Sequence, residues 1–163
     1  TLTGDELLRI GEIHDHQHHF PETLTYYQLA LFTFRENKQA RGVATALVKI
    51  AQVYERQGKI HEAYMALQEA LPIFARSPDR TAHAWALLVM GRVSSRLGYL
   101  ENARASFSQA VTLFDRVKDR HGWNESSVQL GLLDVGDGLT EQGLSLLQQA
   151  WKDAGRSSRK RKP

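Results

Sequence analysis

Apolar and small residues recur along the chain at a fixed spacing of 40 residues. Within each block they follow one another at intervals of three and four, the spacing of one face of an α-helix. Four blocks align without gaps. Three aligned columns are Gly11, Ala51, Gly91 and Gly131; Tyr27, Leu67, Phe107 and Leu147; and Phe34, Phe74, Phe114 and Ala154. The pattern predicts a helical repeat protein.

A chain reversal is predicted in the middle of each block. The column that lies between the two apolar stripes holds His18, Gly58, Gly98 and Gly138, and glycine is favoured just after a helix end. Each block therefore predicts two antiparallel helices, which must stack on their neighbours to bury their apolar faces. The expected fold is an all-α, right-handed α-solenoid of four repeats, about 4–43, 44–83, 84–123 and 124–155, in one domain over residues 1–155. Pro72 predicts a kink or an early end of its helix.

The sequence resembles the tetratricopeptide repeat family. The family pattern occurs as Met90-Gly91, Ala103, Phe107 and Ala110, and as Ile50-Ala51, Tyr54, Ala63, Leu67 and Ala70. The 40-residue spacing, with Asp79-Arg80 and Asp119-Arg120 between repeats, resembles the long-repeat branch. That branch includes kinesin light chains, Pins-type adaptors and bacterial Rap- and MalT-type regulators. The resemblance covers residues 5–154 and implies a groove, lined by the first helix of each pair, that binds a protein or peptide.

The resemblance places six candidate partner-binding residues in this groove, and they are Lys49, Gln52, Arg56, Trp85, Arg92 and Arg96. Arginine and lysine hold carboxylates well, so we expect a partner segment that carries acidic groups. Gln52 would bond the partner's backbone, and Trp85 would supply apolar contact area. Two alternatives stay open. The cations could be solvated or paired with Glu12 and Glu55, and Trp85 could pack on the preceding repeat.

The last helix suggests a second function. Trp151 falls in the column of Leu31, Leu71 and Val111, which predicts core or inter-repeat packing. It could instead be exposed on an outer face that no further repeat covers. Such a face would favour a homodimer through the C-terminal helix, and the chain would then be an oligomerisation or spacer module of a larger regulatory protein.

A histidine cluster suggests a third function. His14, His16, His18 and His19 lie within six residues, with Asp15 among them. Imidazole is a common ligand for zinc, copper and nickel, so the cluster could bind a metal. The alternative is a helix end that carries surface histidines.

Composition narrows the functional classes. The chain has 163 residues, of which 42% are hydrophobic and none is cysteine, and this excludes disulfides, thiolate metal sites and a cysteine nucleophile. The sequence contains no HExxH, Gly-x-Ser-x-Gly or phosphate-loop motif. We therefore expect no enzyme activity and no cofactor. The acidic N-terminus and the lack of a long apolar run predict a cytoplasmic protein without a membrane span.

The positive charge is concentrated at one end. The net charge is +3, but residues 156–163 contain five Lys or Arg residues, so the remainder carries a net charge of −2. This segment is predicted to be a disordered basic tail. Nucleic-acid binding is not expected except weakly through the tail.

Overall fold

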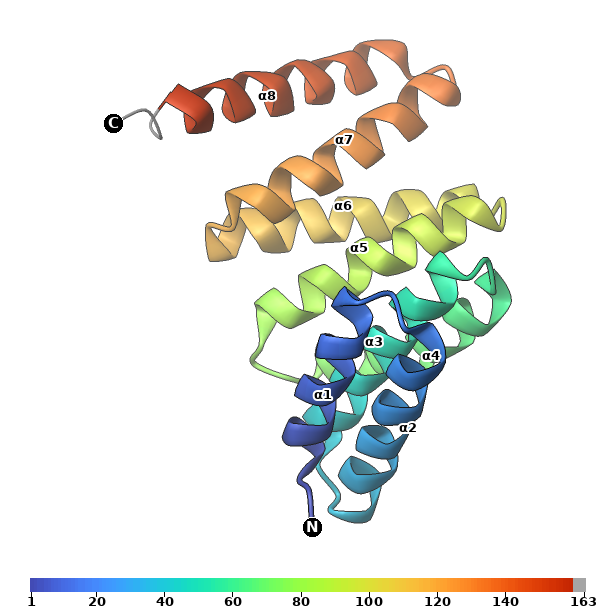
Figure 1. The fold of residues 1–163 in the computed structure, drawn as a ribbon. Helices are drawn as coiled ribbons and strands as arrows, with labels where there is room; N and C mark the ends of the chain where they lie inside the picture. The colour runs from blue at the N-terminus through green and yellow to red at the C-terminus, as the bar shows by residue number, and fades with distance from the viewer. Residues whose placement is uncertain (160–163) are drawn as a thin grey trace. The chain divides into compact units, whose positions relative to one another are not determined.

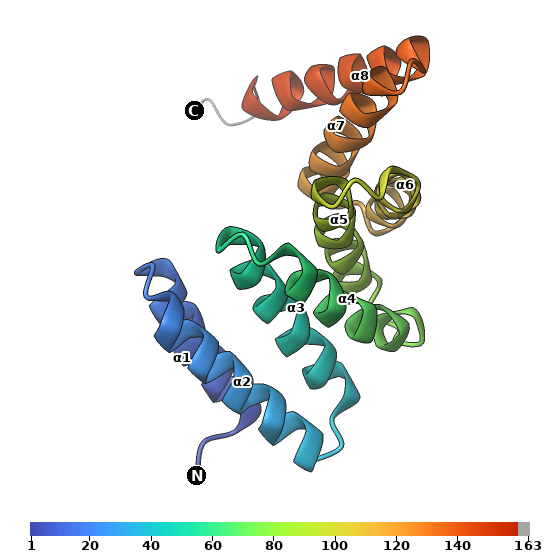
Figure 2. The ribbon, with the colours of Figure 1, turned by 90° about the vertical axis from the view of Figure 1, so that its right-hand side faces the viewer.

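The computed structural model describes residues 1–159, and the side chains of residues 1–156. This part of the chain is all helical and contains no strand (Figures 1 and 2). In chain order the helices are α1 (Gly4–His16), α2 (Phe20–Glu36), α3 (Ala40–Arg56), α4 (Ile60–Ala75), α5 (Arg80–Arg96), α6 (Leu100–Val117), α7 (Arg120–Gly136) and α8 (Thr140–Arg159). The predicted all-α repeat architecture is confirmed. Within the described residues, no helix has both the length and the apolar character that crossing a bilayer requires.

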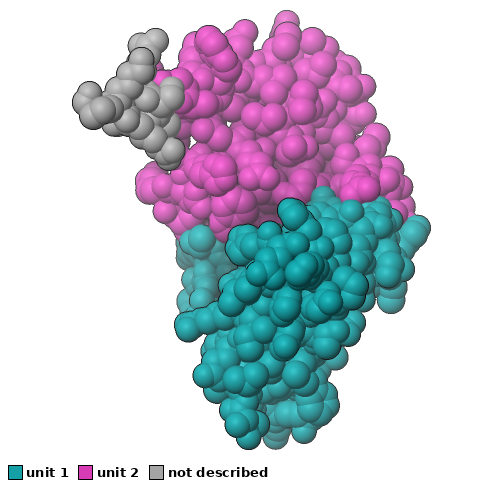
Figure 3. All heavy atoms as spheres, viewed as in Figure 1, with its two compact units in different colours: residues 1–82 teal, residues 83–163 magenta. Residues whose placement is uncertain are grey.

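The chain divides into two compact units, Thr1–Ala82 and His83–Pro163 (Figure 3). The sequence predicted one domain over residues 1–155. Helices α3, α5 and α7 each begin four residues before the predicted repeat starts at 44, 84 and 124. Helix α8 continues to Arg159, past the predicted start of the basic tail at 156. The last four residues of that tail lie outside the described residues.

The turns inside the repeats follow the sequence prediction. Gly58, Gly98 and Gly138 have φ values of 76°, 78° and 83°, which is the left-handed region that glycine adopts without steric cost. His18 occupies the same position with φ 60°, at a cost of about 1–2 kcal/mol for a residue with a side chain. The backbone N–H of His19 donates to the carbonyl of His14 at 3.0 Å, which closes the helix end as the N–H groups of Lys59, Tyr99 and Leu139 do in the other repeats.

The turns between the repeats are of two kinds. Lys38 and Lys118, which follow α2 and α6, adopt the left-handed conformation with φ of 53° and 59°. The equivalent residue after α4 is Pro78, whose ring fixes φ near −65° and forbids that conformation. There the side chain of Asp79 accepts a hydrogen bond from the backbone N–H of Ala82 at 3.0 Å. Asp119 caps α7 in the same way, through the N–H of Gly122 at 3.0 Å. The aspartates of both Asp-Arg pairs therefore start helices.

Pro72 does not end its helix. Helix α4 passes through Pro72 and continues to Ala75, so the predicted early end at the proline is wrong. Pro72 lies on the exposed side of α4, where water can satisfy the carbonyl that has lost its helical partner. The helix is nevertheless 16 residues long, against 17 for α2 and 18 for α6.

Small residues allow the two helices of a repeat to pack closely. A Cβ atom at Gly11 would lie 2.5 Å from the ring of Tyr27, and one at Gly91 would lie 2.4 Å from the ring of Phe107. In the second repeat the same two columns hold Ala51 and the smaller Leu67. Residue size on one helix is thus matched to residue size on the other, which gives the close packing of a protein core.

A phenylalanine near the end of α2 packs α3 onto the α1–α2 pair, and one near the end of α6 packs α7 onto the α5–α6 pair. The ring of Phe34 fills the space beside Gly4 of α1 and Gly42 of α3, since a Cβ at either glycine would come within 2.4 Å of it. Phe114 packs in the same way against Gly122 of α7. Both rings are buried, with 2% and 0% of their area exposed. At the equivalent position α8 carries Ala154.

Candidate functional site

The six predicted partner-binding residues lie on the first helices of the two central repeats. Lys49, Gln52 and Arg56 belong to α3 in the first unit, and Trp85, Arg92 and Arg96 belong to α5 in the second. We describe two surfaces. The first-helix face of unit 1 comprises Glu12, Asp15, Lys49, Gln52 and Arg56, and the first-helix face of unit 2 comprises Trp85, Arg92, Arg96, His121 and Glu125.

The cations of the unit 1 face are paired with carboxylates of the neighbouring helix. The Nζ of Lys49 lies 2.8 Å from Oε1 of Glu12, which was one of the two partners that the sequence suggested. Arg56 donates to Asp15 of α1, a partner the sequence did not suggest. Its guanidinium also lies 5.4 Å from the ring centre of Phe20. The sequence periodicity placed these residues on one face, but the choice of partner depends on side-chain geometry.

The carboxylates of this face act on a buried phenol. Tyr27 is 1% exposed. Burial raises the pKa of its phenol far above the usual value, the negative charges of Asp15 and Glu12 raise that pKa further, and Arg56 opposes them. Tyr27 therefore stays protonated at every physiological pH. It serves as a packing residue beneath the unit 1 face.

The unit 2 face also contains an ion pair between consecutive first helices. The Nη1 of Arg92 lies 3.2 Å from Oε1 of Glu125 on α7, and Nε2 of His121 lies 3.9 Å from the other oxygen of that carboxylate. Arg96 is exposed one turn further along α5. The face thus carries two arginines and one carboxylate, with a histidine at its edge.

Trp85 packs against aromatic rings of α6 and α7. Its ring meets Phe114 edge to face at 4.9 Å between centroids, and it lies 5.8 Å from the ring of His121. The side chain is half-buried. Trp85 therefore supports the Phe114 contact that joins α7 to the α5–α6 pair, and only its remaining surface is available to a partner.

The ion pairs of Lys49 and Arg56 determine which hydrogen bonds this face can offer to a partner. Exposed ion pairs contribute little stability, since both ions are well solvated when apart. They do hold their side chains in fixed positions, with 34% of Lys49 and 41% of Arg56 still exposed. A guanidinium has five N–H donors in a rigid fork, so an arginine in an ion pair can share donors with a second acceptor. The surface therefore presents hydrogen-bond donors at fixed positions.

The histidine cluster does not assemble a metal site in the described part of the chain. No three His, Asp or Glu side chains of those residues come close enough to hold one ion. His14 stacks on Tyr26 at 5.2 Å, His18 forms the turn, and His19 precedes α2. Local structure therefore accounts for the positions of three of these histidines.

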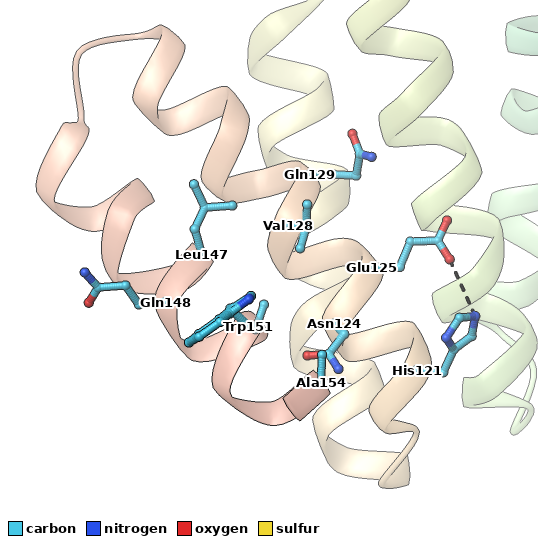
Figure 4. Close-up of a pocket in the computed structure, with 10 residues that line it drawn as sticks. His121, Asn124, Glu125, Val128, Gln129, Leu147, Gln148, Trp151 and Ala154 are labelled. Carbon is cyan, nitrogen blue, oxygen red and sulfur yellow. Dashed lines mark ion pairs between the residues drawn. The ribbon is translucent and has the colours of Figure 1, made fainter. Parts of the chain in front are cut away.

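A second surface lies between α7 and α8. A groove of about 880 Å³ opens there (Figure 4). It is lined by His121, Asn124, Glu125, Val128, Gln129, Leu147, Gln148, Ala150, Trp151 and Ala154. Trp151 is 79% exposed, so of the two positions that the sequence allowed it, the exposed one is correct and the core position is wrong. The sequence signal for the groove was Ala154 in a column of phenylalanines.

Comparisons with known proteins agree with this architecture. Residues 42–116 match the tetratricopeptide repeat family model. The fold is similar to the crystal structure of BtubC (BKLC) from P. vanneervenii, with a TM-score of 0.86 and 16% identity over 95% of this chain and 64% of that one. It is similar to the apo form of RapI (TM-score 0.85, 14% identity, 94% and 43% coverage). It also resembles a Rap protein complexed with Competence and Sporulation Factor, with a TM-score of 0.81 and 17% identity over 93% of this chain and 42% of that one.

These comparisons confirm the resemblance to the tetratricopeptide repeat family and the helical-repeat fold. The chain spans less than two thirds of each of the three solved structures. No curated protein sequence matches it.

Proposed function

We propose that the chain is a non-catalytic scaffold that binds a protein or peptide segment through its first-helix faces. The observation that carries this proposal is made in each unit separately: Arg56 of the unit 1 face and Arg92 of the unit 2 face are each held by a carboxylate of a neighbouring first helix. Tetratricopeptide repeats are generally interaction modules. One structurally similar Rap protein is complexed with Competence and Sporulation Factor, which supports the same use of this fold.

The partner segment carries acidic groups in this proposal. Lys49, Arg56, Arg92 and Arg96 supply the positive charge, Gln52 bonds the partner's backbone, and the accessible part of Trp85 contributes apolar contact. Because Lys49, Arg56 and Arg92 are paired with intrachain carboxylates, an acidic partner shares donors with those carboxylates. Each such contact is therefore worth less than a charge-assisted hydrogen bond to an unpaired arginine. Specificity then depends on the fixed positions of the donors within each face, which lower the ordering cost of binding.

The test is capture of a partner from lysate, followed by binding measurements with the purified partner. The variant is Arg92→Glu/Arg96→Glu. Its matched control is Arg76→Glu/Arg116→Glu, which makes the same charge change at two exposed positions away from the first helices. Arg76 directly follows α4, and Arg116 lies in α6. We expect the first variant to weaken binding at least tenfold and the control to leave it within a factor of two or so. Equal loss in both variants would show that only overall charge matters and would contradict the proposal.

Self-association is the second candidate function, and the exposure of Trp151 favours it. Trp151 is 79% exposed on α8 beside a groove, and exposed apolar surface of this kind is typical of interaction sites. Light scattering of the chain over a concentration series tests this candidate. A mass of one chain at every concentration would remove it.

A further inference from the structure

The groove between α7 and α8 has occupied counterparts in the other repeats of the same chain. In the first unit α3 packs on the α1–α2 pair, and in the second α7 packs on α6 beside α5. In both cases the incoming helix presents small residues four positions apart, Gly42 and Ala46 in α3, and Gly122 and Ser126 in α7. Ala46 and Ser126 are fully buried. The chain thus shows twice that this cleft accepts a helix.

The fourth repeat reverses the sizes of the residues in this cleft. Near their C-terminal ends α2 and α6 carry Phe34 and Phe114, whereas α8 carries Ala154 at the equivalent position. The base of the α7–α8 groove therefore lacks a large side chain. One turn earlier α8 has the large Trp151 in place of half-buried Leu31 or Val111, and it lies beside Ala154 on the edge of the groove (Figure 4). The groove therefore lacks one large side chain and displays another.

We propose that α8 of a second copy fills this groove in a two-fold symmetric dimer, with Trp151 of each copy packed on Ala154 of the other. The proposal rests on the second candidate function, self-association, and names its surface. A two-fold axis perpendicular to α8 makes the paired helices antiparallel. This is the orientation that α3 has relative to α2, so symmetry imposes the geometry that the cleft already accepts.

The register of the paired helices follows from the same contact. If Trp151 faces Ala154 of the other copy, then Gly155 faces Ala150, because residue numbers run in opposite directions along antiparallel helices. Trp151 and Gly155 are four positions apart, as are Gly42 and Ala46 of α3. Among the described atoms, a Cβ added at Gly155 would meet none within 4 Å.

One side-chain oxygen in the groove, Oδ1 of Asn124, has no hydrogen-bond donor among the described residues of its own chain. The second copy can supply that donor. The Oδ1 of Asn124 is shielded from solvent and receives no hydrogen bond in the described structure. Shielded acceptors of this kind are costly when unpaired. A tryptophan entering a protein interface brings an indole N–H, which is a donor that needs an acceptor. Asn124 and Trp151 are therefore complementary across the two copies.

A head-to-tail arrangement fits the groove less well. It would place α1 of a second copy on the α7–α8 pair. The α1 residue that corresponds to Ala46 and Ser126 is Glu6, which is exposed and forms a capping box with Thr3. Burying an unpaired carboxylate is strongly unfavourable, whereas α8 presents Trp151 and Gly155 without a charge between them on that face.

The test is sedimentation equilibrium of the full 163-residue chain over a concentration series. We expect a dimer that Trp151→Ala weakens at least tenfold, as truncation of a central tryptophan does in other interfaces. Ala154→Trp should weaken it similarly by overfilling the contact. The double variant Trp151→Ala/Ala154→Trp exchanges the large and small residues, so it should recover most of the lost affinity. Circular dichroism melting confirms that each variant is folded.

Phe32→Ala is the matched control, because it removes another exposed aromatic side chain (60% exposed) from α2, away from the groove. It should leave the dissociation constant unchanged. A wild-type chain that stays monomeric overturns both self-association and this inference. A dimer that survives Trp151→Ala, or that loses as much affinity from Phe32→Ala, leaves self-association standing and overturns the proposed surface. A double variant whose dimer dissociation constant is no lower than those of the single variants also overturns the proposed surface. The substituted residues Trp151, Ala154 and Phe32 lie outside the first-helix faces, although the groove shares His121 and Glu125 with the unit 2 face.

Discussion

Phe114 and Ala154 occupy the same position in successive repeats, but their surroundings differ completely. Phe114 is fully buried between Trp85 and Gly122, and it joins α7 to the preceding helix pair. Ala154 is exposed at the edge of an open groove beside Trp151. The comparison shows that one repeat position is core where a following helix covers it and surface where none does. It also predicts that substitutions at equivalent positions have very different effects.

The largest effect is expected at the covered position. Phe114→Ala removes a buried ring from between two helices, so it should lower the free energy of unfolding by about 3–5 kcal/mol. Trp151→Ala removes a larger ring that is mostly in water, so it should change the unfolding free energy of the monomer by less than about 0.5 kcal/mol. Urea titrations at low protein concentration measure both values. Similar losses in the two variants would contradict the contrast.

Glycine-to-alanine substitutions extend the same comparison, because we expect opposite changes in stability at the covered and the open position. A Cβ at Gly122 would lie 2.3 Å from the ring of Phe114, so Gly122→Ala should destabilise the chain by about 1–3 kcal/mol through overpacking. Gly155 lies in α8 with open space around it, so Gly155→Ala should stabilise by up to about 1 kcal/mol through helix propensity. Thermal melts compare them directly. Stabilisation by Gly122→Ala would mean that the helices are not in close contact.

Helix starts provide a smaller contrast between the two units. Asp119 caps α7, so Asp119→Ala should cost about 1 kcal/mol. Gln39 precedes α3 without a side-chain hydrogen bond to it, so Gln39→Ala should have little effect on stability. Chemical denaturation of the two variants tests the assignment. An equal loss would show that the cap bond is not what starts α7.

The smallest effect is a pH dependence at the start of α1. Hydrogen bonds from the backbone and the side chain of Thr3 lower the pKa of Glu6 below its usual value. The contribution of Glu6 to stability is therefore present above the pKa of the unfolded chain and is lost as pH falls through the folded value. Thr3→Ala should reduce the fall in melting temperature between neutral and acidic pH. The backbone N–H of residue 3 still donates to Glu6 in this variant, so an unchanged fall would show that the side-chain hydrogen bond does not contribute.

Much of the fold could be predicted from the sequence because it depends on local periodicity. The columns that contain Gly91, Phe107 and Ala110 placed the helix faces correctly, and the glycine column placed three of the turns. The sequence analysis interpreted Asp79 and Asp119 as family markers, whereas in the structure they cap α5 and α7. The division into two units was not predicted, because it depends on the density of contacts and not on the repeat pattern.

The candidate site was less predictable, because it depends on long side chains. The sequence grouped Arg56 and Arg92 correctly on first helices, but the partners Asp15 and Glu125 come from neighbouring repeats and were not predicted. Trp85 had no unique position from its column alone. The groove at α8 could be recognised from Ala154 only by comparing that column with the packing of Phe34 and Phe114.

The most direct test of the proposed function is hydrogen exchange of the chain with and without its captured partner. Binding at the first-helix faces should slow amide exchange in residues 40–56 and 80–96, because bound helices open less often. Exchange in the second helices, residues 60–75 and 100–117, should change much less. Protection confined to the second helices or to α8 would place the partner elsewhere and contradict the account.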